Sequence, residues 1–146
     1  MKKQAYITGL LFIFLTLALT SCKKDEPASL GDLLIGKWEV QNLRMVYFLE
    51  NVKEFEYIDY YYNEEFGYEF TGGDNIIQYI DGDAYAMAYF TLDGNSISID
   101  TGGDPIEWKN VAVNGNTLTW EETRTEVYNE ITYDVEYFFT AVRTSK

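Results

Sequence analysis

Carboxylates are the side chains here best suited to acid–base or metal chemistry, because the chain has 24 Asp and Glu residues and no histidine. Two carboxyl groups can hydrolyse a glycosidic bond when they lie about 5–9 Å apart across it. The adjacent pairs Glu64-Glu65 and Glu121-Glu122 do not form such a site by themselves, because neighbours on a strand point to opposite faces. A carboxylate-based hydrolase would need two acids from different strands to meet in one cleft.

Other enzyme and metal classes are excluded or disfavoured by the same count. Without histidine, the Ser-His-Asp and Cys-His arrangements cannot form. The run Asp81-Gly82-Asp83 is similar to a calcium loop, but position twelve is Leu92 rather than the chelating Glu, so we predict a hairpin turn. No phosphate-binding glycine loop occurs. We therefore predict a non-enzymatic protein with no catalytic residue, no metal and no cofactor. A net charge of −13 argues against nucleic-acid binding.

Aromatic residues are the stronger candidates for a binding site. The segment 55–70 interleaves aromatic and acidic residues, and its centre is Tyr60-Tyr61-Tyr62. Tyrosine combines an apolar ring with a polar tip, which suits ligand mouths and wet interfaces. These three residues are therefore candidates for contact with a ligand, a partner protein or a glycan. The alternative is ordinary packing, since aromatic residues favour strands. Three consecutive residues cannot share one face of a strand, so at least one of them points away from its neighbours.

The run 84–92 offers two alternative faces for a cavity. Ala86 and Ala88 share one face with Ala84 and Phe90, whereas Tyr85, Met87 and Tyr89 share the other. Small residues on an inner face would leave room for a ligand or for bulky neighbours. If a cavity exists, either the alanine face or the face with Tyr85, Met87 and Tyr89 lines it, and the sequence does not decide between them.

The first residues have the pattern of an export signal. Lys2 and Lys3 precede an apolar run, 5–19, which is shorter than the roughly 20 residues that span a bilayer. The following Leu19-Thr20-Ser21-Cys22 resembles the cleavage box of bacterial lipoproteins. That resemblance implies removal of residues 1–21 and attachment of diacylglycerol to Cys22, the chain's one cysteine. Two acyl chains are enough for stable membrane anchoring.

The residues after the cysteine predict a tether and a cellular location. Lys23-Lys24-Asp25-Glu26 resembles the surface-export signal of Bacteroidetes outer-membrane lipoproteins, and the alternative is a plain solvated tether. We predict a signal peptide at 1–21, a lipidated tether at 22–29 and one folded domain at 30–146. The resemblance implies a bacterial outer-membrane protein that a lipid anchors, with the membrane as its first partner. The export signal, where it applies, implies exposure on the cell surface.

The rest of the chain has the two-residue period of half-buried strands. Ser29 and Asp32 have the spacing of a helix N-cap, so one short helical turn precedes Gly36. Asp-Gly and Asn-Gly pairs mark hairpin turns between apolar runs. A bulge near Asn42 reconciles the parity of the first strand. The predicted strands are 37–49, 53–62, 65–71, 75–80, 84–92, 95–100, 105–113, 116–123 and 129–143.

Hairpin-linked strands of this number predict an all-β fold. We expect a small antiparallel up-and-down β-barrel of about eight strands, because closure removes exposed edges, with a β-sandwich as the alternative. Gly36-Lys37-Trp38, at the start of the first strand, resembles the opening of lipocalin-like domains. In that family the tryptophan plugs the closed end of the barrel and a basic residue packs over it. The resemblance thus implies closure by Trp38 and Arg143, with Arg124 as a weaker candidate.

The resemblance also implies a function. A lipocalin-like barrel binds a small apolar or aromatic ligand, so the first hypothesis is an envelope binding protein. The alternative is an interaction module without a cavity, which would use its tyrosine-rich face against a protein or a glycan.

Overall fold

The computed structural model describes residues 28–62 and 65–145. The predicted signal peptide, Cys22 and most of the tether lie outside these residues, and so does Glu64. No helix among the described residues is long and apolar enough to cross a membrane. The described part contains one short helix, α2 (Leu30–Leu34), and nine strands. The strands are β1 (Gly36–Leu49), β2 (Val52–Tyr60), β3 (Phe66–Thr71), β4 (Asn75–Ile80), β5 (Asp83–Asp93), β6 (Ser96–Asp100), β7 (Ile106–Asn114), β8 (Thr117–Tyr128) and β9 (Ile131–Ser145).

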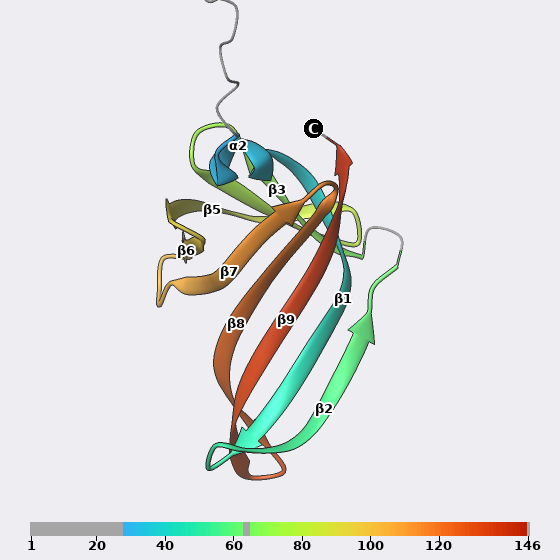
Figure 1. The fold of residues 1–146 in the computed structure, drawn as a ribbon, viewed down its shortest axis with the longest axis vertical. Helices are drawn as coiled ribbons and strands as arrows, with labels where there is room; N and C mark the ends of the chain where they lie inside the picture. The colour runs from blue at the N-terminus through green and yellow to red at the C-terminus, as the bar shows by residue number, and fades with distance from the viewer. Residues whose placement is uncertain (1–27, 63–64, 146) are drawn as a thin grey trace, which may run out of the picture.

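The strands form a closed antiparallel barrel, as the sequence predicts. Neighbours pair in the order β1-β3-β4-β5-β6-β7-β8-β9, and β9 pairs again with β1. Closure rules out the alternative β-sandwich. One wall is taller than the other, because β2, β1, β9 and β8 extend well beyond β3–β7 (Figure 1). The barrel therefore has a compact end, next to α2, and an open end where the tall wall stands alone.

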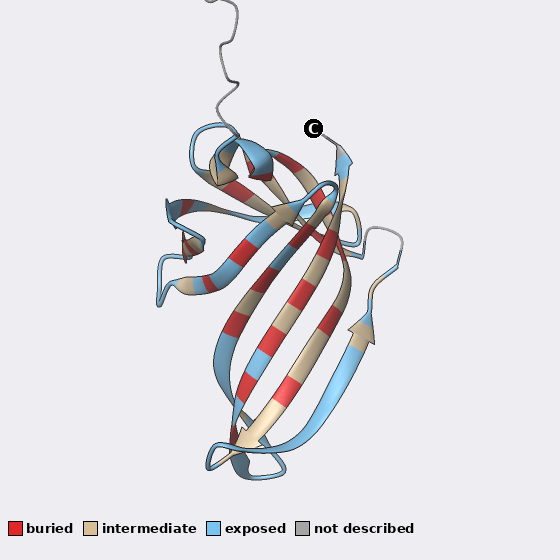
Figure 2. Ribbon diagram, viewed as in Figure 1, coloured by how far each residue is buried: buried red, intermediate tan, exposed pale blue. Residues whose placement is uncertain are grey.

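Two strands, β2 and β3, pair with the same edge of β1, so the topology differs from a simple meander. The early part of β1, up to Glu39, pairs with β3, and its later part, from Asn42, pairs with β2 on the same edge. β2 ends at Tyr60, and β3 begins at Phe66. Within the described residues, β2 pairs only with β1, and almost all of its residues are exposed (Figure 2).

The strand β8 ends five residues later than predicted, at Tyr128 instead of residue 123. Its early part pairs with both β7 and β9, but beyond Glu121 it pairs only with β9. The turn that follows is Asn129-Glu130, and both residues have positive φ, at 50° and 67°. Positive φ at both central positions matches the twist of a two-residue hairpin. Since this turn lacks glycine, the local residue pattern predicts it only weakly.

The core lies in the compact half of the barrel. A register shift between Val40 and Asn42 puts Trp38, Val40 and Leu43 all among the buried residues, as the predicted bulge requires. Three rings from adjacent strands form a stack: Trp108 and Trp120 have centroids 4.3 Å apart, and Trp120 and Phe139 have centroids 4.6 Å apart. Bands of buried residues alternate with exposed ones along β9 and β8 (Figure 2). Burial of these rings stabilises the fold, since each contributes roughly 2–3 kcal/mol.

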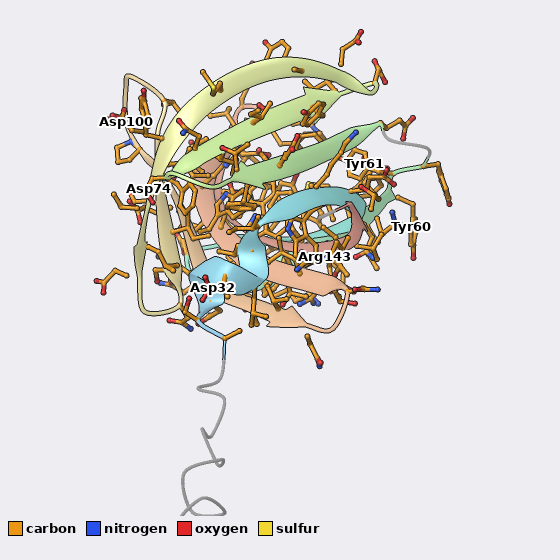
Figure 3. The ribbon with its side chains drawn as sticks, turned by 90° about the horizontal axis from the view of Figure 1, so that it is seen from above. Asp32, Tyr60, Tyr61, Asp74, Asp100 and Arg143 are labelled. Atoms are coloured by element: carbon orange, nitrogen blue, oxygen red, sulfur yellow. The ribbon has the colours of Figure 1, made fainter. Side chains whose placement is uncertain are left out.

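The short helix covers the compact end of the barrel and is held there by the first and last strands. Ser29 caps it as predicted, with Ser29 and Asp32 each accepting a hydrogen bond from the other's backbone N–H. Trp38 Nε1 donates to the Leu34 carbonyl at 2.6 Å. Arg143 donates to the carbonyls of Leu33 and Ile35, and its guanidinium lies 4.2 Å from the centre of the Trp38 ring. The side chains that fill this end are seen from above in Figure 3.

Gly67 allows the close approach of β3 to β1, which leads to a stability prediction. A Cβ added at Gly67 would lie 2.5 Å from the Trp38 carbonyl oxygen, closer than van der Waals contact allows. Relief would require a backbone shift beside the buried Trp38. We expect Gly67→Ala to lower the free energy of unfolding by about 1–3 kcal/mol in urea denaturation. Gly72→Ala is the matched control, because its added Cβ meets nothing within 4 Å. Equal stability of the two variants would contradict this account of the β1–β3 contact.

Candidate functional site: a cavity in the open half of the barrel

The barrel encloses a cavity of about 370 Å³ between the aromatic stack and the open end. All eight strands of the closed barrel contribute to its wall. This volume lies at the small end of the range for ligand pockets, which is about 300–1,000 Å³. Apolar cavities of only about 150 Å³ already accept a molecule such as benzene. The cavity can therefore hold a small organic molecule.

Most of the cavity wall is apolar and aromatic. Trp108 and Phe139 form part of it, and both belong to the core stack. Phe66 and Tyr68 of β3 pack edge to face with centroids 5.2 Å apart, and Tyr68 also meets Trp108 edge to face at 4.9 Å. These rings adopt rigid, mutually supporting positions, which favour a flat apolar ligand.

One charged pair involves the cavity wall, to which Arg124 but not Glu122 contributes. Arg124 of β8 forms part of the wall, and its guanidinium donates through Nε and Nη2 to Glu122 Oε2, the first at 3.0 Å. Glu122 is only 2% exposed, and its other oxygen accepts from Trp120 Nε1 at 3.2 Å. Arg124 also lies 5.2 Å from the centre of the Tyr137 ring. The positive charge of Arg124 is thus fixed in place and balanced by a buried carboxylate.

A second carboxylate lies further along β8, two strand repeats beyond Glu122 and on the same face of the strand. Glu126 accepts hydrogen bonds from the hydroxyls of Tyr137 and Tyr47, the latter at 3.3 Å. Burial raises the pKa of the Tyr137 hydroxyl, and the hydrogen bond to Glu126 raises it further. Tyr137 therefore remains a neutral donor across the physiological range and holds Glu126 at the inner face of the tall wall.

Several donors along the cavity have no acceptor in the described part of the chain. The Tyr68 hydroxyl and the Gln78 amide, on residues that face each other across β3 and β4, make no side-chain hydrogen bond there. Burial raises the pKa of Tyr68, and the nearby Glu122 raises it further, so its hydroxyl keeps its proton. The buried Trp108 Nε1 also lacks a partner within the described residues. A buried donor without an acceptor costs about 1–3 kcal/mol.

The three predicted tyrosines at the end of β2 separate at the rim of the cavity. Tyr61 is half-buried, lines the cavity and packs on Phe66 with centroids 5.6 Å apart. Tyr60 and Tyr62 are exposed, and Tyr60 lies at the margin of the molecule (Figure 3). Asp59 and Glu65 lie beside Tyr61 in a second, more open hollow at this rim. The rim is thus aromatic and acidic.

The structure also decides between the two faces of β5. Ala86 and Ala88 line the cavity, as one alternative predicted. Tyr85, Met87 and Tyr89 lie on the outer surface, with exposed fractions of 72%, 71% and 66%. Two small side chains on the inner face therefore leave part of the cavity volume open. The three outer residues do not line the cavity, so they are available for contact with another molecule.

The carboxylates considered for catalysis do not gather. Glu121 lies on the outer face of β8 and accepts from Asn110, whereas Glu122 lies in the interior. Asp81 and Gly82 form the hairpin turn between β4 and β5, with φ of 51° and 81°, as predicted for this run. No group of three acidic or thiol side chains suited to a metal occurs among the described residues.

The inward polar residues of β8 were missed as site residues from sequence. Arg124 was considered only as a partner for Trp38, and it lies instead on the ring of Tyr137. Glu122 entered only as part of the adjacent pair Glu121-Glu122, and Glu126 was not among the candidates. A signal was present: all three share the parity of the inward Trp120, at steps of two along β8. Extending the predicted strand past residue 123 would have placed them inside.

The unequal burial of the three tyrosines predicts unequal effects of substitution. We expect Tyr61→Ser to lower the free energy of unfolding by about 1–2 kcal/mol, because it removes a packed ring. Tyr60→Ser and Tyr62→Ser should change it by less than about 0.5 kcal/mol, since both rings are exposed. Urea denaturation of the three variants measures these differences. A large loss of stability at Tyr60 or Tyr62 would contradict their placement at the surface.

No family model, curated protein or solved structure matches this chain.

Proposed function

We propose that this protein is a lipid-anchored binding protein of the bacterial envelope, whose barrel holds a small apolar or aromatic molecule. The observation that supports this most is the cavity of about 370 Å³ with its largely aromatic wall. The strand β5 contributes only two alanine side chains to that wall, which leaves the space open. A barrel built for stability alone would fill this space, because protein interiors pack to nearly crystal density. The lipocalin-like pattern of Gly36-Lys37-Trp38 favours the same function.

The position of the N-terminal end adds an orientation to the proposal. The first described residues lead directly into α2, which covers the compact end of the barrel (Figure 1). The open end of the barrel lies opposite α2 (Figure 1), and Arg124, Tyr61 and Phe66 are among the residues that line the cavity. If Cys22 carries the lipid, a tether of a few residues holds the compact end towards the membrane. The open end then faces away from the bilayer, so a ligand enters from the aqueous side.

The proposed binding can be tested by calorimetry with a small aromatic probe. We expect 2-acetylnaphthalene to bind the purified full chain with one site and a dissociation constant of about 1–100 µM. Bovine serum albumin and a lysozyme serve as positive and negative reference proteins. If neither this probe nor related naphthalenes bind, the barrel is not a receptor for molecules of this size, and the proposal fails. Mass spectrometry of membrane fractions tests the acyl groups on Cys22 separately.

A second candidate function uses the outer surface. Tyr85, Met87 and Tyr89 form an exposed apolar stripe along β5, and such a stripe favours contact with a protein or a glycan. Replacing all three by Ser should abolish retention of the protein on immobilised envelope glycans while it leaves probe binding in the cavity unchanged. Retention that survives the triple substitution would exclude this surface.

A further inference from the structure

The charges around the cavity bear on which ligand class it accepts. Arg124 is the one basic residue among the side chains that line the cavity and the adjoining rim hollow. Its charge is already paired with Glu122, whose carboxylate is fixed by Trp120. Glu126, Asp59 and Glu65 add negative charge close to the opening. A carboxylate ligand would meet no unpaired cation and would be repelled by these acids.

The hydrogen-bonding groups around the cavity are mainly donors without acceptors. The Tyr68 hydroxyl keeps its proton, and the Gln78 amide lies opposite it on β4. Arg124 donates to Glu122 through Nε and Nη2, and no partner for Nη1 occurs in the described part of the chain. The wall has other polar side chains, but Thr101 and Tyr137 already donate to Asp104 and Glu126. A ligand with a hydrogen-bond acceptor could accept from the donors of Tyr68, Gln78 and Arg124 Nη1, which have no other partner among the described residues.

We propose that the ligand is an uncharged, mainly aromatic or aliphatic molecule that carries a hydrogen-bond acceptor such as a ketone or ester carbonyl. This inference rests on the proposed binding function and specifies its ligand. The apolar part of the ligand packs against Trp108 and Phe139. Its carbonyl accepts hydrogen bonds from Tyr68, Gln78 and Arg124. Glu122 is a specificity-determining residue, because its charge cancels that of Arg124 and so excludes organic anions.

Three probes of nearly equal shape test the preference for a hydrogen-bond acceptor and the exclusion of negative charge separately. They are 2-acetylnaphthalene, 2-ethylnaphthalene and 2-naphthoate, which carry a carbonyl, no acceptor and a charged acceptor. Calorimetry with the full chain at pH 7 should rank the ketone about five- to tenfold tighter than the hydrocarbon, as one or two hydrogen bonds predict. Naphthoate should bind at least tenfold more weakly than the ketone.

The outcomes distinguish this inference from the proposed function. Naphthoate as the tightest probe, or equal affinities for ketone and hydrocarbon, would overturn the ligand class while leaving a functional cavity. Binding of none of the three would overturn both. Because the ranking is measured on the unmodified chain, it does not depend on whether any variant folds.

Two substitutions test the assigned residues. Tyr68→Phe removes one donor and keeps the ring, so it should weaken binding of the ketone about threefold or more and leave the hydrocarbon unchanged. Glu122→Gln retains an acceptor for Trp120 Nε1 and leaves Arg124 uncompensated, so it should tighten binding of naphthoate about tenfold. Glu136→Gln is the matched control, because it changes the net charge equally from an exposed position on β9. An equal gain from Glu136→Gln, or no gain from Glu122→Gln, would overturn the role of Glu122.

Discussion

Replacing Arg143 with methionine should lower the free energy of unfolding by about 3 kcal/mol. The guanidinium donates to the Leu33 and Ile35 carbonyls at the end of α2 and lies 4.2 Å from the centre of the Trp38 ring. Helix ends leave carbonyls without internal partners, and hydrogen bonds from a charged donor contribute about 1.5–3 kcal/mol each. The cation–π contact adds roughly 0.5–1 kcal/mol. Urea denaturation followed by tryptophan fluorescence measures the loss.

Arg44 provides the matched control for this prediction. Its guanidinium also lies over an aromatic ring, 4.1 Å from the centre of Phe138, but it interacts with Glu56 on the outer surface. We expect Arg44→Met to lower the free energy of unfolding by less than about 1 kcal/mol, as is usual for exposed ion pairs. Arg143→Lys should fall between the two, because lysine keeps the charge but cannot reach both carbonyls with a planar fork. Equal losses from Arg143→Met and Arg44→Met would show that the bonds to α2 contribute little.

Filling the cavity should abolish ligand binding without unfolding the barrel. Ala88 lies on β5 at the cavity wall, so the ring of Ala88→Phe would enter the open space. We expect the dissociation constant for 2-acetylnaphthalene to rise at least a hundredfold, because the ring and the probe compete for the same volume. The free energy of unfolding should stay within about 1 kcal/mol of its original value, since the added apolar area offsets local strain.

Met87→Phe is the control on the other face of the same strand. This residue is 71% exposed, so a ring there adds apolar area outside the barrel and leaves the cavity unchanged. Its affinity for the probe should equal that of the original protein. If Ala88→Phe binds as well as Met87→Phe does, the probe does not occupy the barrel cavity.

The strand boundaries could be predicted from local pattern because most strands bury one face. Along β9, Tyr133, Val135 and Tyr137 are buried and the residues between them are exposed or half-buried. The same alternation, interrupted by the bulge before Asn42, located β1. Glycine-containing turns separated the middle strands. Closure into a barrel followed from hydrophobic pattern and strand number, and the pairing of β1 with β9 confirms it.

Two features required information that local pattern does not contain. The departure of β2 from the barrel depends on which part of β1 each of β2 and β3 pairs with, and both run along the same edge. The end of β8 was misplaced because Glu122, Arg124 and Glu126 interrupt its apolar inner face. Inward polar residues weaken the strand signal at the place where the cavity acquires its polar groups. Exceptions to local rules are expected where a protein binds something.

Methyl NMR of the alanine residues tests the central claim, that the barrel cavity is the binding site, most directly. In the full chain with labelled alanine methyl groups, saturating 2-acetylnaphthalene should give intermolecular NOEs to Ala86 and Ala88, which line the cavity. The methyl group of Ala112, exposed on β7, should give none. NOEs confined to exposed alanines, or binding without any NOE to Ala86 and Ala88, would contradict the claim.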